Sequence, residues 1–202
     1  MTTAGRTNRR EPQQERSRIT RERLLSSTIE ALAQDGWSAA TVAAVAERAG
    51  VSRGAAQHHF PTREALITAT LEQVFDDLAD SATRAHPVPD DADRVSVAVE
   101  HAVAMYTGTE FKAALQIWAA AASDSALRAL ILPMEARFAR AAHRTTMAVL
   151  GAEPDDDAAH RAVQATLDLA RGLGLADTLS DDSARRAQVV ATWSEMMRAM
   201  LV

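Results

Sequence analysis

The chain has 202 residues, of which 47% are hydrophobic and 24% are charged, so it is long enough and apolar enough to bury a core. It has no cysteine, which excludes disulfides, thiolate metal sites and a cysteine nucleophile. The net charge is −5, but residues 1–64 alone carry +3, which points to an anionic partner at that end of the chain. Forty-four alanines against 8 glycines and 6 prolines favour an all-α fold.

The N-terminal residues 1–17 are predicted to be a flexible, arginine-rich arm, because charged tails of this kind are usually solvated. The arm has no apolar segment typical of a signal peptide, and the longest stretches without a charge are 11 residues. A membrane-spanning helix needs about 18 apolar residues, so none is expected. We therefore expect a cytoplasmic protein that does not contact membranes.

Three helices are predicted next, over residues 18–35, 41–50 and 52–60. The first carries Leu25, Ile29 and Leu32 at helical spacing. Thr41 and Ser52 are the expected N-caps of the second and third, which are short. A longer amphipathic helix follows from residue 62 to about 78, and Pro61 separates it from the third.

The second and third helices have the spacing of a helix-turn-helix, because only the turn 49–52 separates them. Gly50 can adopt the positive φ that so sharp a turn requires. The third helix would present Arg53, Gln57 and His58 outward with few bulky side chains at its start, which suits the major groove of DNA. A helical hairpin without a DNA-binding role has a similar pattern, so both interpretations remain open at this point.

Residues 18–66 resemble the DNA-binding domain of the TetR family of bacterial transcriptional regulators. The segments that carry the resemblance are AGVSRG at 49–54 and HFP at 59–61, followed by an acidic residue, alanine and leucine. The resemblance implies three domains: the arm at 1–17, a three-helix DNA-binding domain at 18–65, and a helical ligand-binding and dimerisation bundle at 66–202. Beyond residue 66 only the length and the helical pattern agree with the family.

The resemblance also implies which residues face double-stranded DNA. The set carried over by position is Arg18, Thr41, Ser52, Arg53, Ala55, Gln57, His58, His59 and Arg63. This chain departs from the family at Ala56 and Gln57, where leucine and then tyrosine are common, and at Arg63, where lysine is usual. Arg53 and Gln57 lead as base-contacting residues, since glutamine can bond an adenine edge through two hydrogen bonds. The departures leave the operator sequence undefined.

Helices are predicted beyond the proline-rich segment 86–89, over residues 91–107, 109–123, 125–150, 155–179 and 181–201. Family membership would place a small-molecule pocket among them. Its candidate lining combines large adaptable side chains with a few polar ones: Met105, Phe111, Gln116, Trp118, Met134, Arg137, Phe138, His143 and Met147. The simpler interpretation of each residue is ordinary core. The acidic composition of this part favours an apolar or cationic effector.

The last two predicted helices carry a broad apolar surface that one buried seam does not account for. Its members are Val163, Leu167, Ala170, Gly174, Val189, Trp193, Met196, Met197 and Met200. Contact with a second copy about a twofold axis would cover this surface, as the family resemblance also implies. The alternative is burial within one chain.

Catalytic signatures are missing from the sequence. There is no HExxH metal motif and no glycine-rich phosphate loop, and His58 and His59 lack a partner at the spacing of a zinc helix. We expect neither enzyme activity, nor a metal, nor a cofactor. The family resemblance implies a ligand-responsive DNA-binding regulator, acting as a homodimeric repressor on a palindromic operator. The alternative is a helical protein-interaction module that does not bind DNA.

Overall fold

The computed structural model describes residues 10–83, 88–89 and 92–201, and every regular element in those ranges is helical, as the composition predicts. The chain forms two compact units, Met1–Gln73 and Val74–Val202. The division falls inside α4 (Arg63–Thr83), and the boundary expected at residues 65–66 lies nearer the start of the same helix.

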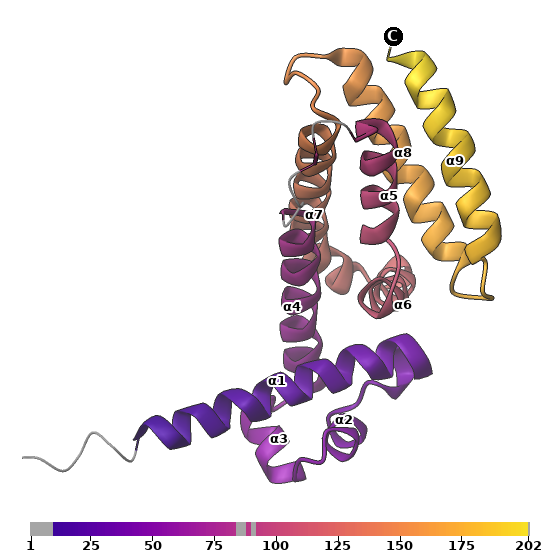
Figure 1. Ribbon diagram of the computed structural model, residues 1–202. Coiled ribbons are helices and arrows are strands. Elements are labelled where there is room, and N and C mark those ends of the chain that lie inside the picture. Colours follow the sequence, from indigo (N-terminus) through magenta and orange to yellow (C-terminus); the bar gives the residue numbers. More distant parts are fainter. Residues whose placement is uncertain (1–9, 84–87, 90–91, 202) are drawn as a thin grey trace, which may run out of the picture. The chain divides into compact units, whose positions relative to one another are not determined.

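The first helix, α1 (Arg10–Asp35), begins eight residues before the expected start at residue 18. Residues 10–17, predicted to be part of a flexible arm, are therefore helical, whereas residues 1–9 of that arm lie outside the described part of the chain. Figure 1 shows α1 as a long helix. Arg18 explains part of the extension, because it pairs with Glu15 one turn before it and with Glu22 one turn after it.

The two short helices of the first unit are α2 (Val42–Arg48) and α3 (Arg53–His59). Both predicted caps are confirmed: Thr41 Oγ1 accepts from the Ala44 amide at 3.2 Å, and Ser52 Oγ accepts from the Ala55 amide at 3.2 Å. Gly50 has a φ of 63°, so the turn uses the left-handed conformation that glycine tolerates. The result is the helix-turn-helix expected from the spacing.

The core of the first unit lies where these helices meet. Its buried members are Leu24, Leu25, Val45, Ala46, Ala56, Phe60 and Leu66. Ala46 and Ala56 are fully buried, and their small side chains let α2 and α3 approach closely. This packing fixes which face of α3 points outward.

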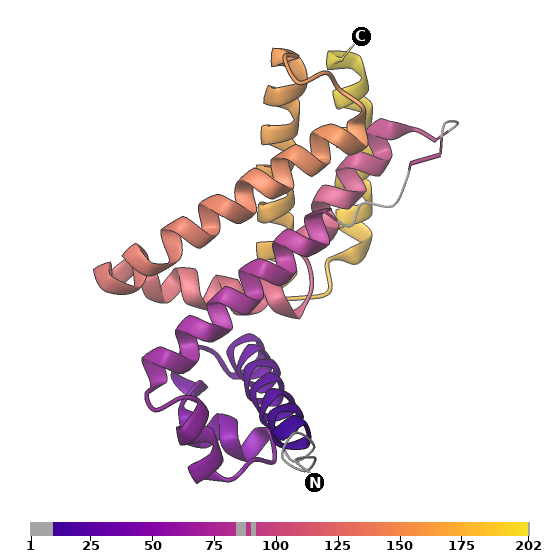
Figure 2. The same cartoon turned by 90° about the vertical axis from the view of Figure 1, so that its left-hand side faces the viewer.

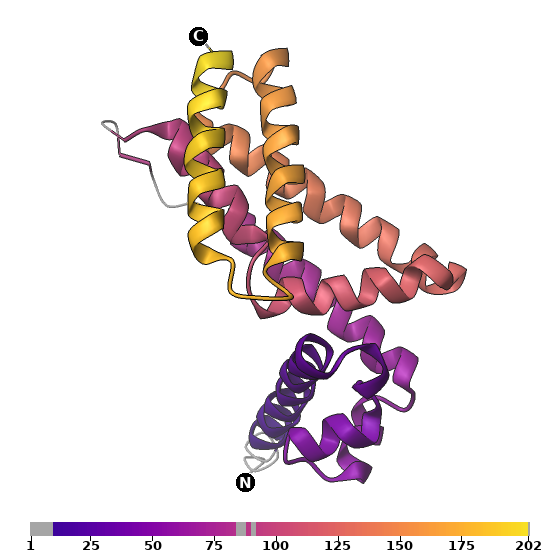
Figure 3. The same cartoon turned by 90° about the vertical axis from the view of Figure 1, so that its right-hand side faces the viewer.

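The second unit contains the end of α4 and five further helices. These are α5 (Arg94–Met105), α6 (Thr109–Ser123), α7 (Ser125–Leu150), α8 (Asp157–Ala176) and α9 (Ser183–Met200). In Figures 2 and 3, α6 and α7 form a hairpin at one edge of the unit, and α8 and α9 lie side by side. Helix α5 packs against α7, α8 and α9, which makes it the central helix of the bundle.

Aromatic rings fill the centre of this unit. Tyr106 lies edge-on to Phe111 and to Phe138, with ring centroids 5.3 and 5.6 Å apart, and Phe75 continues the cluster. Gly174 of α8 approaches the cluster so closely that a Cβ there would lie 1.9 Å from the backbone oxygen of Tyr106. The position therefore requires glycine for space.

Candidate nucleic-acid interface

Helix α3 presents a polar face to solvent. Arg53, Gln57 and His58 are exposed, whereas Ala56 on the opposite side is fully buried. Gly54 and Ala55 keep the first turn free of bulky side chains, so the backbone itself can approach a surface. A short helix with this face suits the major groove, where arginine and glutamine can contact base edges.

The two capping side chains stand at the starts of α2 and α3. Thr41 and Ser52 are both exposed, and each uses its hydroxyl oxygen to accept an amide hydrogen bond. The hydroxyl hydrogen of each group stays available for donation to an anion. The caps therefore fix the helix starts and can also contact phosphate.

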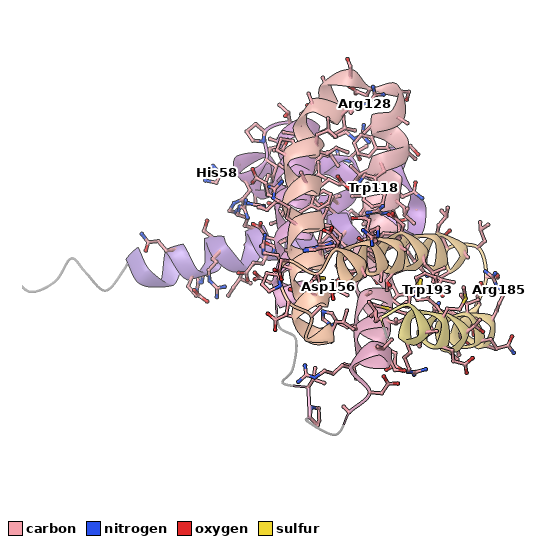
Figure 4. The ribbon with its side chains drawn as sticks, turned by 90° about the horizontal axis from the view of Figure 1, so that it is seen from above. His58, Trp118, Arg128, Asp156, Arg185 and Trp193 are labelled. Atoms are coloured by element: carbon pink, nitrogen blue, oxygen red, sulfur yellow. The ribbon has the colours of Figure 1, made fainter. Side chains whose placement is uncertain are left out.

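A cluster of cationic and aromatic groups lies at the end of α3. The rings of His58 and His59 are 5.7 Å apart, and the Arg21 guanidinium stands over the Phe60 ring at 5.5 Å. His58 projects from the helix in Figure 4, while His59 is partly buried. Burial lowers the pKa of His59 below its usual range, and the nearby positive groups His58 and Arg21 lower it further.

We expect this depressed pKa to make the first unit less stable in acid. The unfolded chain binds a proton on His59 at a higher pH than the folded chain does, so stability falls as the pH drops below about 6.5, until the folded chain also binds the proton. In His59→Gln this component of the pH dependence should disappear. Urea unfolding from pH 7.5 to 5 measures it, and equal slopes in both proteins would contradict the pKa shift.

Two predicted DNA-facing arginines already have partners within the chain. Arg18 is exposed and pairs with Glu15 and Glu22, so a phosphate would compete with these carboxylates. Arg63 is half-buried, and its guanidinium donates to the backbone oxygens of Ala40 and Trp37. Arg63, which the family resemblance places among the DNA-facing residues, is therefore already bonded within its own chain.

The residues expected to line a pocket are not arranged around one space. Met105, Phe111, Phe138 and Met147 are buried in the core, where the aromatic cluster fills the interior. The remainder are more exposed: Gln116, Trp118, Met134 and His143 partly, and Arg137 openly, paired with Asp76. His143 stacks on His160, with ring centroids 5.1 Å apart. The core interpretation therefore holds for the four buried residues.

A groove of about 490 Å³ lies between α5 and α9, which the sequence did not indicate. Small side chains such as Ala104 and Ala191 line it, and Glu100 and Glu195 add negative charge. Arg186 and Arg198 also line the groove, but they pair with Asp177 and Asp93.

A smaller recess of about 250 Å³ includes Trp118, the one predicted pocket residue in either space, together with Arg128 and Arg171. Figure 4 shows Trp118 and Arg128.

The surface expected for a second copy divides into two sets. Val163, Leu167, Ala170, Gly174 and Met197 are buried within the second unit, so they cannot contact a partner as predicted. Trp193 joins α9 to α8, because its indole nitrogen donates to Thr166 Oγ1 at 2.9 Å.

The other set remains on the surface. Met196 and Met200 are about half exposed, and Val189 and Trp193 are partly exposed around a recess of about 380 Å³. Leu175 and Leu179 of the chain segment around the end of α8 are also exposed, at 56% and 90%. The sequence pattern did not single out this pair, in which Leu175 lies in the last turn of α8 and Leu179 in the turn that follows it. An exposed apolar surface of this kind is typical of a protein interface.

The described residues contain no helix long and apolar enough to cross a membrane. Across the same residues, no group of three or more histidine, cysteine, aspartate or glutamate side chains could hold a metal ion.

Comparison with known proteins supports a regulatory role for the helix-turn-helix. Residues 24–70 match the family model described as "Bacterial regulatory proteins, tetR family". The HTH-type transcriptional regulator CymR of Pseudomonas putida is 31% identical over 121 residues, which are 59% of this chain and 60% of CymR. BetI 2 of Chromohalobacter salexigens is 32% identical over 117 residues, which are 55% of this chain and 56% of that protein. The chain thus spans less than two thirds of these relatives, which are regulators and not enzymes.

Solved structures share the fold over nearly the whole chain. A transcriptional regulator from Rhodococcus sp. Rha1 superposes with a TM-score of 0.69 at 22% identity, covering 90% of this chain and 95% of that one. GusR of Salmonella enterica gives 0.65 at 19% identity, covering 91% and 95%. Similarity at this level of identity establishes the arrangement of helices alone.

Proposed function

Because the chain belongs to the TetR family of bacterial regulatory proteins, we propose that it is a DNA-binding transcriptional repressor controlled by a small molecule. The observation that carries this proposal is the polar face of α3, with Arg53 and Gln57 exposed beside a first turn of small residues. A repressor acts on the chromosome, so its place is the cytoplasm.

On DNA, α3 would lie in the major groove and divide its contacts between bases and phosphates. Arg53 suits a guanine edge and Gln57 an adenine edge, each through two hydrogen bonds. Thr41, Ser52 and His58 would contact the backbone, with Arg18 and the other exposed arginines of α1 adding charge. Phosphate contacts set the position of the protein, and the two base contacts set its sequence preference.

A palindromic operator requires two copies of α3 about one DNA turn apart, roughly 34–36 Å. We assign the contact between copies to the exposed apolar surface of α8 and α9 that includes Met196 and Met200. Methionine adapts to irregular surfaces, and the recess beside Trp193 gives a partner side chain a place to pack.

The effector would act by favouring a conformation of the dimer that fits DNA poorly. Its effect is limited by its differential affinity, and about 5.5 kcal/mol moves a population from 1:99 to 99:1. The groove between α5 and α9 supports an apolar or cationic compound, because its arginines are already paired and Glu100 and Glu195 add negative charge.

Selection of bound sequences from a random DNA pool tests the function directly. We expect a two-fold symmetric consensus with half-sites about one turn apart. A helical protein-interaction module would select no sequence, which would reject the proposal. Candidate effectors can then be scored by their release of the selected DNA.

Truncating the two proposed base-contacting side chains should weaken operator binding selectively. Arg53→Ala and Gln57→Ala should each cost about 1–3 kcal/mol and relax sequence preference at one position per half-site. Arg140→Ala, an exposed arginine of the second unit, removes the same charge as Arg53→Ala and should leave binding unchanged. Binding of labelled operator at constant salt measures the difference, and a uniform effect of all three variants would refute the assignment.

A further inference from the structure

Arg63, the first residue of α4, connects back to the segment that leads into α2. Its Nε donates to the Ala40 backbone oxygen at 2.9 Å, and its Nη2 donates to the Trp37 backbone oxygen at 2.5 Å. The flat guanidinium also lies over the Trp37 ring, 4.6 Å from the centroid. One side chain therefore holds two backbone groups and one aromatic ring.

These contacts close a loop that contains both helices of the helix-turn-helix. Ala40 is fully buried and directly precedes Thr41, the N-cap of α2. Arg63 follows α3 by only a few residues. The Arg63 guanidinium therefore joins the start of α2 to the segment that follows α3. Arg63 and Ala40 are 23 residues apart along the chain.

The geometry also depends on arginine in particular. Two diverging N–H groups and a planar face are properties of the guanidinium, whereas the lysine ammonium is a compact point charge. A lysine at this position would keep the positive charge for DNA but could not reproduce the paired donation and stacking. Charge and geometry can therefore be separated by experiment.

We propose that Arg63 is a positioning residue, which fixes the pose of α3 by joining the start of α4 to the entry of α2, and that it does not serve mainly to neutralise a phosphate. This inference rests on the proposed DNA-binding function. Any movement of the first turn of α4 would be carried to Thr41 and the base of α2 through the same side chain.

The test compares Arg63→Lys and Arg63→Ala on the selected operator and on DNA of unrelated sequence, across a range of salt concentrations. Both variants should bind the operator about tenfold more weakly, as expected for the loss of one charge-assisted hydrogen bond or more. Their affinity for unrelated DNA and the salt dependence of Arg63→Lys should equal those of the wild type. Arg140→Lys, at an exposed arginine of the second unit, is the matched control and should bind normally.

A phosphate contact gives a different result. Arg63→Lys would then keep operator affinity, and Arg63→Ala would lower the salt slope by about 0.9 on both DNAs, which would overturn the proposal. If Arg63 has a purely structural role, variants that circular dichroism shows to be folded at the binding temperature would bind the operator with wild-type affinity. That result would also overturn the proposal. If the wild type selects no DNA sequence, the proposed function itself fails.

Trp37→Leu provides a second variant in case the Arg63 variants do not fold. It removes the stacking surface without changing any charge, so a loss of operator affinity cannot come from phosphate neutralisation. We expect about a threefold loss, in line with the strength of a cation–π contact. Unchanged operator affinity in folded Trp37→Leu would refute the positioning role.

Discussion

Replacing Gly174 with alanine is expected to destabilise the folded chain by about 3 kcal/mol, near the upper end for overpacking of a core. The new Cβ would lie 1.9 Å from the Tyr106 backbone oxygen and 2.6 Å from the Phe111 ring. The first neighbour is backbone, and the ring belongs to the buried aromatic cluster, so neither can move without disturbing α5 and α6. Urea unfolding at a fixed protein concentration measures the change in free energy.

Gly172 supplies a control on the same helix. A Cβ at Gly172 would meet no atom within 4 Å, and alanine favours helix over glycine by about 0.5–1 kcal/mol. Gly172→Ala should therefore stabilise the protein slightly, while Gly174→Ala does the opposite. Equal effects at the two positions would show that α8 does not pack against Tyr106 in this way.

A protein carrying both Met196→Glu and Met200→Glu is expected to be a folded monomer that binds the operator about 10²–10⁴-fold more weakly. Both methionines are about half exposed, so carboxylates there cost the isolated chain little. In a dimer they would place four like charges in an apolar contact. The loss in affinity follows because linked binding to two half-sites gains roughly this factor over binding to one.

Ala187→Glu with Ala191→Glu is the matched control. These residues are exposed on the same helix with the same four-residue spacing, but they line the groove with α5. The control should remain dimeric and should bind normally. Sedimentation with operator titration measures both properties. Dimerisation by the methionine double variant would show that another surface joins the copies.

Local chemistry accounts for what the sequence predicted well. Thr41, Ser52 and Gly50 act through the backbone next to them, so their roles follow from residue type and order. The interpretation of residues 10–17 as a flexible arm failed for the opposite reason. The arm was expected to be solvated because it is rich in charge, whereas its Glu15 pairs along a helix with Arg18, which also pairs with Glu22.

In the second unit, the sequence pattern does not predict which surfaces are covered or which spaces are filled. An apolar stripe on α8 gives no sign of whether its own chain or a partner covers it, and Val163 and Leu167 turn out to be covered by their own chain. Large side chains predicted to surround a cavity can equally fill it, as Phe111 and Phe138 do. Arg63 could not be assigned either, because its partners lie 23 and 26 residues away.

The packing of α8 and α9 against each other within one chain also affects how the proposed repression would depend on the concentration of the protein. Val163, Leu167 and Met197 are buried inside one chain, so in the proposed dimer a single subunit would keep its core when alone and could exchange between dimers. At low abundance, operator occupancy would then rise with the square of the regulator's concentration. A modest change in the amount of regulator would then change operator occupancy more steeply than it would for a dimer that never dissociates.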